Sequence, residues 1–100
     1  MSGAQLKRLE AGKIEVAGSL SFNNVADLLS HSAVFFKKSE SLVFDLGNVE
    51  NADSSGLALL VEWMKMAKQS GQSLSFQRIP KQMLDIARLS DLDELLPLVE

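Results

Sequence analysis

Apolar and polar positions near the N-terminus follow the two-residue period of β-strands. Residues 13–17 alternate polar and apolar side chains, as a half-buried strand does, and residues 5–9 form a similar short segment before them. The segment Glu10-Ala11-Gly12 between them predicts a hairpin turn, and Gly18 is expected to close the second strand. The run 42–46 is almost continuously apolar, which predicts a central strand covered by helices on both faces.

Apolar positions recur with helical spacing in the segments after these strands. Ser21 can cap a helix that extends to about His31, and its inward side chains would be Val25, Leu28 and Leu29. A second helix should run to about Ser70, where Gly71 provides a C-terminal stop. Its inward stripe has the i, i+3, i+4, i+7 spacing and consists of Leu57, Leu60, Val61, Met64 and Ala67.

The last quarter of the chain predicts one strand, one helix and a short final element. Residues 73–77 alternate like a strand. Pro80 suits the first turn of a helix whose inward side chains would be Met83, Ile86, Ala87 and Leu89. Residues 92–99 form a short helix or a strand, because Pro97 is unfavourable inside a long helix. The order β-β-α-β-α-β-α then predicts a small mixed sheet, with an antiparallel hairpin and right-handed parallel crossovers.

Composition is that of an ordinary soluble domain. One hundred residues suffice for one hydrophobic core, so we expect a single domain over residues 1–100. Hydrophobic residues make up 46% and charged residues 23%, and no apolar stretch approaches the roughly 20 residues that a membrane span needs. The segment 1–5 lacks the basic start and apolar core of a secretion signal. We therefore expect a cytoplasmic protein without direct membrane insertion.

The residue inventory argues against several functional classes. The net charge is −3 and no basic stripe is present, so nucleic acid is not expected as the main ligand. The chain has no cysteine and a single histidine, His31, and its glycines form no phosphate-binding loop. Asp45 and Asp53 could both lie near the C-terminal end of a strand, but two carboxylates alone are weak evidence of an active site. We expect no catalytic residues, no metal and no cofactor.

The most informative segment is Asp53-Ser54-Ser55-Gly56, which a connection over residues 48–52 links to the central strand. A helix that begins here leaves backbone N–H groups unpaired and favours negative charge. In a structural interpretation, Asp53 or Ser54 caps the helix, worth about 1 kcal/mol, and Gly56 lets the turn pack closely. In a functional interpretation, the corner contacts a partner or accepts a phosphoryl group at Ser55 or Ser54. Asp53 would oppose that phosphate while the helix start would favour it.

Three further residues become candidates because of their place on the second helix. Trp63 and Met66 fall outside the predicted inward stripe, and Leu59 does so to a lesser degree. An exposed tryptophan beside methionine is typical of a surface that another protein covers. The predicted partner-binding residues are therefore Asp53, Ser54, Ser55, Gly56, Leu59, Trp63 and Met66.

The arrangement of these segments resembles the STAS domain, a fold named for sulfate transporters and anti-sigma factor antagonists. The resemblance is carried by Phe44-Asp45-Leu46, by Asp53-Ser54-Ser55-Gly56-Leu57 and by the helix that ends at Gly71 before a strand. It covers about residues 5–99. It implies an α/β fold in which a small mixed β-sheet is flanked by about three to four α-helices.

Two branches of that family differ at the corner. In anti-sigma factor antagonists, the second hydroxyl of the motif, which is Ser55 here, is phosphorylated by a partner kinase. In MlaB-like STAS subunits of the Mla phospholipid-transport ABC complex, the usual motif is aspartate, threonine, alanine and glycine, so the hydroxyl corresponds to Ser54. Because this chain has serine at both positions, the motif alone leaves both branches open.

The remaining segments that are similar to the MlaB-like branch are 16–22, 56–60, 67–71, 86–90 and 95–97. This resemblance implies a non-enzymatic cytoplasmic subunit, peripheral to the inner membrane. Such a subunit binds and regulates or stabilises the ATPase (MlaF-like) of a complex with permease and lipid-carrier subunits. That complex maintains outer-membrane lipid asymmetry. The alternative is an anti-sigma factor antagonist that is switched by phosphorylation at Ser55.

Overall fold

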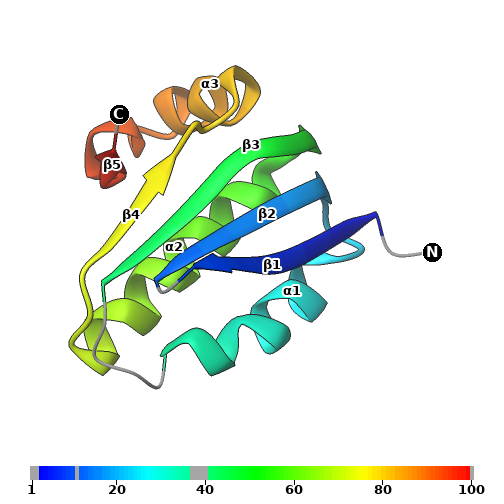
Figure 1. Ribbon diagram of the computed structural model, residues 1–100. Helices are drawn as coiled ribbons and strands as arrows, with labels where there is room; N and C mark the ends of the chain where they lie inside the picture. Colours follow the sequence, from blue (N-terminus) through cyan, green and yellow to red (C-terminus); the bar gives the residue numbers. More distant parts are fainter. Residues whose placement is uncertain (1–2, 11, 37–40, 100) are drawn as a thin grey trace.

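A five-stranded mixed sheet forms the centre of the structure (Figure 1). The computed structural model describes residues 3–10, 12–36 and 41–99. The strands lie side by side in chain order, as β1 (Ala4–Glu10), β2 (Lys13–Leu20), β3 (Leu42–Ala52), β4 (Leu74–Gln77) and β5 (Leu98–Val99). β1 is antiparallel to β2, and every later pair of neighbours is parallel. The predicted hairpin and mixed sheet are thus confirmed, although Ala11 of the turn lies outside the described residues.

A layer of helices packs on one side of this sheet. Its members are α1 (Val25–Ser32) with the 3-10 turn η1 (Ala33–Phe36), α2 (Ser54–Ser70) and α3 (Lys81–Leu89). In Figure 1, α2 lies behind the sheet and α1 lies below β1; α2 contacts α1, and α3 contacts α2 and β3. A second 3-10 turn, η2 (Asp93–Leu95), leads into β5, so the tail contains both elements that the sequence left open. The core fills the space between helices and sheet, and its largest side chains include Trp63, Phe44 and Phe76.

The central strand is longer than predicted, and helices cover only one of its faces. β3 continues beyond residue 46 to Ala52, through residues 48–52 that the sequence suggested as a connection, because these residues pair with the second half of β2 across two register shifts. Phe44 is buried in the helix-facing core. Asp45, next to it, points to the opposite face, where it bonds to Arg78. The expectation of helices on both faces of residues 42–46 is therefore wrong (Figure 1).

Gly18 does not close β2, which runs on to Leu20. Its φ of +94° is favourable only for glycine, and a Cβ there would collide with the carbonyl of Gly3. The close approach lets Ser19 N donate to Gly3 O at 2.7 Å. This glycine therefore keeps β1 against an irregular part of β2.

Two helix predictions need correction at their ends. α1 begins at Val25, so its N-cap position is Asn24 and not Ser21. The Asn24 side chain makes no bond to the helix start and accepts a hydrogen bond from Ser21 N at 2.9 Å. Leu28 is buried, while Val25 and Leu29 are half-buried.

In α3, Met83 and Ala87 are buried as predicted, and Ile86 is half-buried. Leu89 is 89% exposed, contrary to expectation, because two residues beyond Ala87 is the opposite side of a helix. α2 ends at Ser70, and Gly71 follows with the predicted left-handed conformation at φ +72°.

Candidate functional site

The corner between β3 and α2 is held by the carboxylate of Asp53. Asp53 caps α2, since its Oδ1 accepts from Ser55 N at 2.8 Å. Its Oδ2 accepts from Phe22 N at 3.4 Å, in the loop that follows β2. Asp53 N donates to Leu20 O at 3.1 Å, so the corner is also tied to the end of β2. The capping interpretation is therefore confirmed for Asp53, and its carboxylate also joins α2 to the loop before α1.

The four corner residues differ in accessibility. Asp53 and Ser54 are exposed, Ser55 is half-buried and Gly56 is buried. A Cβ at Gly56 would lie 3.0 Å from the Cβ of Leu20 and 3.3 Å from that of Ala52, so a larger residue would push α2 away from the sheet. Gly56 thus has the packing role that the sequence suggested. The hydroxyl best displayed to another molecule is that of Ser54.

The prediction that Trp63 and Leu59 are exposed is wrong. Trp63 is 0% and Leu59 is 3% exposed. The Trp63 ring stacks on Phe44 with centroids 4.2 Å apart, and its Nε1 donates to Ser32 Oγ at 2.8 Å. Met66 is half-buried against the core. These three residues therefore do not form the exposed surface expected of them.

The cause is a rotation of α2 about its axis relative to the predicted stripe. The fully buried positions are Gly56, Leu57, Leu59, Leu60, Trp63 and Ala67. Val61 and Met64, which the sequence placed in the stripe, are only half-buried. Leu57, Leu60 and Ala67 belong to both the predicted and the observed stripe, so apolar periodicity alone does not distinguish the two stripes.

An apolar groove runs between α1 and α2 and opens beside the corner. This α1–α2 groove has a volume of about 290 Å³ and is lined by Val25, Ala26, Leu29, Ser55, Ala58, Leu59 and Glu62. Phe22, whose N–H bonds to Asp53, is 81% exposed in the loop before α1. Sequence reasoning missed the groove and Phe22, because nothing in the pattern shows which faces of two helices meet.

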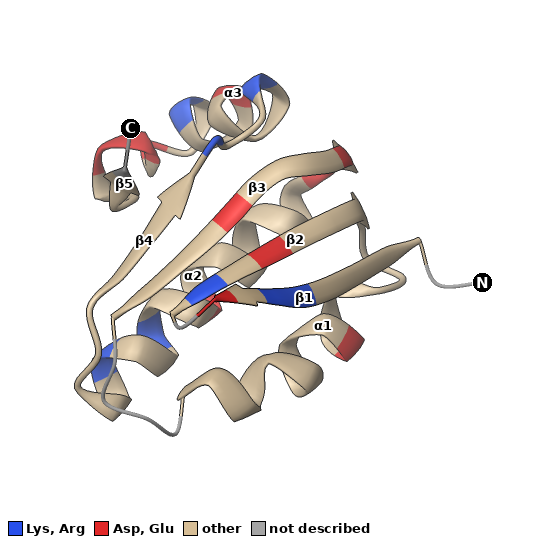
Figure 2. Cartoon of the chain, viewed as in Figure 1, with Lys and Arg blue, Asp and Glu red and all other residues tan. Residues whose placement is uncertain are grey.

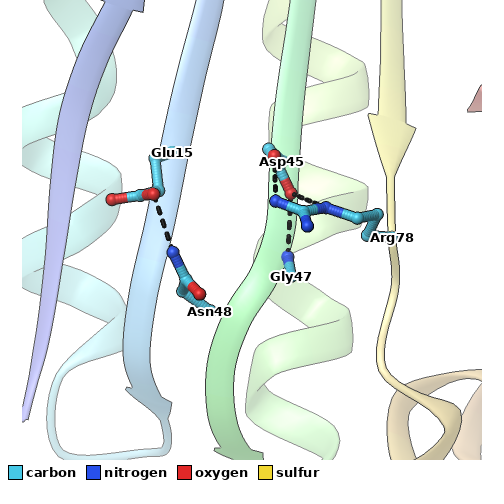
Figure 3. Close-up of polar contacts among 5 residues, drawn as sticks. All are labelled: Glu15, Asp45, Gly47, Asn48 and Arg78. Atoms are coloured by element: carbon cyan, nitrogen blue, oxygen red, sulfur yellow. Dashed lines mark hydrogen bonds and ion pairs between the residues drawn. The ribbon is translucent and has the colours of Figure 1, made fainter.

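A second polar cluster lies on the helix-free face of the sheet, away from the corner (Figure 3). Asp45 Oδ1 and Oδ2 accept from Arg78 Nε at 3.0 Å and Nη2 at 2.7 Å, and Oδ1 also accepts from Gly47 N at 2.9 Å. The hydrogen bonds from Arg78 hold the pKa of Asp45 below its ordinary value. Burial of the carboxylate raises this pKa, but its effect is smaller than that of the hydrogen bonds. Asn48 bonds to Glu15 beside this pair at 2.7 Å.

The hydrogen bonds of Asp45 stabilise the local structure of the sheet face. A Cβ at Gly47 would lie 2.6 Å from Arg78 Nε, so the glycine makes room for the guanidinium, while Arg78 adopts a left-handed φ of +56°. The Asp45 carboxylate bonds to Arg78 on the face of the sheet, whereas the Asp53 carboxylate bonds to Ser55 N at the start of α2. The structure does not bring them together as an acid–base pair.

The single histidine lies apart from the corner serines. His31 lies exposed in the last turn of α1, as predicted, and lines a hollow of about 700 Å³ together with Asn24 and Asp27. These residues occupy a different side of α1 from those that line the α1–α2 groove with Ser55. Among residues 3–10, 12–36 and 41–99, no three His, Asp or Glu side chains gather as metal ligands. No helix in the same ranges has the length and apolar character of a membrane span.

Comparison with known proteins gives one family match and several structural matches. A family model described as "Mlab, STAS domain" matches residues 4–100. No match was found among curated protein sequences.

The similar solved structures share the fold at low sequence identity. Unphosphorylated SpoIIAA, an anti-sigma factor antagonist, has a TM-score of 0.72 at 13% identity, over 97% of this chain and 88% of its own. A putative anti-sigma factor antagonist from Thermotoga maritima has a TM-score of 0.73 at 17% sequence identity, over 97% of this chain and 86% of its own. An anti-sigma factor antagonist from Mycobacterium paratuberculosis has a TM-score of 0.72 at 21% identity, over 95% of this chain and 82% of its own. At such identities the matches establish the shared fold and leave the function to the site itself.

Proposed function

The chain belongs to the STAS domain family described by the MlaB model, and from this membership and the corner's geometry we propose that it is a non-enzymatic regulatory subunit of an ABC transporter. In this proposal it binds the ATPase subunit of a phospholipid-transporting complex with permease and lipid-carrier subunits. It regulates or stabilises that ATPase on the cytoplasmic side of the membrane. The complex serves outer-membrane lipid asymmetry.

The observation that carries the proposal is the exposed hydroxyl of Ser54 at a rigid corner. Ser54 follows the capping residue Asp53, whose carboxylate binds both Ser55 N and Phe22 N. The backbone on each side of Ser54 is thereby fixed, so a partner would meet a preorganised surface and lose little entropy in ordering it. MlaB-like motifs carry their hydroxyl at this position.

Binding to a purified ABC ATPase subunit from the same organism tests the proposal. We expect wild-type protein to form a stable complex, and Ser54→Asp to weaken it at least tenfold, because a new carboxylate would meet a surface fitted to a neutral hydroxyl. Its melting temperature should stay close to wild type, since the start of α2 tolerates negative charge. Ser90→Asp changes an exposed serine at the far end of α3 and serves as the matched control.

Two results would contradict this proposal. One is the absence of any complex between the wild-type chain and the ATPase. The other is a parallel loss of melting temperature and affinity in Ser54→Asp, which would reduce the corner to a helix cap.

A second candidate function is an anti-sigma factor antagonist switched at Ser55. It is favoured by the serine at that position and by the structural likeness to SpoIIAA, which has also been solved in a phosphorylated form at 15% identity and a TM-score of 0.66. It predicts ATP-dependent phosphate incorporation at Ser55 by a partner kinase. Mass spectrometry of the protein isolated from stressed cells, with Ser55 unmodified throughout, would count against this candidate.

A further inference from the structure

The α1–α2 groove exists because small residues stand where the two helices face each other. Ala26 on α1 and Ala58 on α2 are both exposed and both line the groove. Leu59, 3% exposed, is anchored in the core and contributes to the apolar lining. Larger side chains at the two alanines would fill this space, as side chains do between most packed helices. The groove is therefore a space on the surface that the side chains of α1 and α2 do not fill, and it is not a cavity inside the core.

Exposed Phe22 lies in the loop before α1, and its N–H bonds to Asp53 at the corner. Val25, three residues later, lines the groove, and so does Ser55 of the corner. Single exposed apolar residues are common on proteins, but the backbone of this one is bonded to the corner at which the groove opens. Together the groove and the corner residues make one surface with an apolar centre and a polar corner, which is the composition of a protein interface.

The charge around this surface is acidic. Among the described residues that line the groove, Glu62 is the one with a charge, and Asp53 flanks the groove at the corner, whereas Asp27 lies on the other side of α1. The α1 ribbon carries an acidic segment and no basic one (Figure 2). Lys65 lies close to Glu62, with an Nζ–Oε2 distance of 3.1 Å, but both side chains are largely exposed, so water weakens that pair. A partner complementary to this surface carries positive charge.

The groove's size favours a side chain over a free ligand. Its volume of about 290 Å³ is at the lower limit of the roughly 300–1,000 Å³ that is typical of small-molecule pockets, and the groove is open to solvent, whereas such pockets enclose most of their ligand. One large aliphatic or aromatic side chain would occupy it and cover Ala26, Ala58 and the exposed edge of Leu29.

We propose that the α1–α2 groove is the anchor point for the ATPase partner: a large apolar side chain of the ATPase inserts between Ala26 and Ala58, and a neighbouring Lys or Arg faces Asp53 and Glu62. This inference rests on the proposed function and adds the position and chemistry of the contact. It places the partner's main apolar contact between α1 and the side of α2 that carries Ser55 and Leu59.

Filling the groove tests the inference with the wild-type ATPase as the probe. Ala58→Trp should weaken binding by about 10- to 100-fold, the loss that corresponds to one buried apolar side chain. Because Ala58 is exposed, its melting temperature should change little. Gln69→Trp adds the same ring to an exposed position near the other end of α2 and should bind like wild type. If Ala58→Trp fails to fold, Ala26→Gln obstructs the groove from the opposite wall and gives the same comparison.

The acidic rim is tested by salt dependence. Glu62→Gln should slow association with the ATPase several-fold at low ionic strength, and this difference should shrink at high salt.

Three results would overturn the inference in distinguishable ways. Equal affinity of Ala58→Trp and Gln69→Trp for the ATPase would refute the role of the groove and leave the proposed function intact. Failure of the wild-type chain to bind the ATPase would refute both the role of the groove and the proposed function. A wild-type dimer that Ala58→Trp converts to a monomer in sedimentation would assign the groove to a second copy of this chain instead.

Discussion

The hydrogen bond between Trp63 and Ser32 gives the sharpest test of the core. Trp63 Nε1 donates to Ser32 Oγ at 2.8 Å, and both residues are 0% exposed. The Ser32 hydroxyl donates in turn to Leu29 O at 2.7 Å. Ser32→Ala removes the acceptor and leaves the indole N–H buried without that partner.

The expected loss can be worked from these contacts. A buried donor left unsatisfied costs about 1–3 kcal/mol, and the lost bond to Leu29 O adds about 1 kcal/mol, so the sum is about 2–4 kcal/mol. Unfolding entropies of roughly 2.1 cal/mol/K per residue give about 0.2 kcal/mol/K for 100 residues, so the melting temperature should fall by about 10–20 °C. In a Trp63→Phe background the orphaned donor is absent, and Ser32→Ala should then cost only about 1 kcal/mol.

Thermal unfolding of the four proteins in this cycle measures the difference directly. Trp63 is the single tryptophan, so its fluorescence also reports whether the ring stays shielded in folded Ser32→Ala. Equal losses from Ser32→Ala in the wild-type and Trp63→Phe backgrounds would refute the reasoning. So would wild-type tryptophan emission typical of a solvated indole.

Two further predictions concern carboxylates. Asp45→Asn should destabilise the protein by about 1–2 kcal/mol at neutral pH, because it weakens the bonds to the largely exposed Arg78 while Gly47 N keeps an acceptor. Since the folded-state pKa of Asp45 is lowered from 3.8, its contribution is complete above that pH and is lost as the pH falls through the folded-state value. Urea unfolding of both proteins should therefore differ by a constant amount at neutral pH and converge in acid; a gap that persists in strong acid would be inconsistent with this pair. Asp53→Ala should cost about 1 kcal/mol through the lost cap to Ser55 N, whereas Asp53→Asn keeps an acceptor and should lose less; equal losses in thermal melts would argue against capping.

The sequence predicted the ends of α2 well and its rotation badly, for a physical reason. Both ends depend on local chemistry: Asp53 supplies a cap and Gly71 supplies a left-handed stop, with φ +72°. The buried face depends on what the helix meets. Gly56 approaches Leu20 closely, and this contact turns Trp63 toward Phe44. A neighbour that distant in the chain leaves no trace in the periodicity of the helix itself.

The same limit explains the errors around β3. Residues 47–52 are mostly polar, which is typical of a connection, yet they extend the strand because β2 supplies hydrogen-bonding partners. Asp45 interrupts an apolar run without ending it, since Arg78 reaches across the sheet face to neutralise it. Each departure comes from a pairing between segments about 30 residues apart. By contrast, the cap of α2 at Asp53 could be predicted because the residues that form it are contiguous.

The positions of Ser54 and Ser55 relate the two candidate functions to one surface. Ser54 faces solvent, so a phosphate there would leave the α1–α2 groove open. Ser55 lines that groove, next to Ala58 and Glu62, and a phosphate on it would place nearly two negative charges on an apolar wall that is already acidic. Modification at Ser55 would therefore repel a basic partner from the groove and also occupy the space its apolar side chain needs. A phospho-switched antagonist requires that event to be reversible, whereas a permanent transporter subunit requires it to be absent. The phosphorylation state of Ser55 in the cell thus discriminates between the two functions, even though both would use the same contact surface.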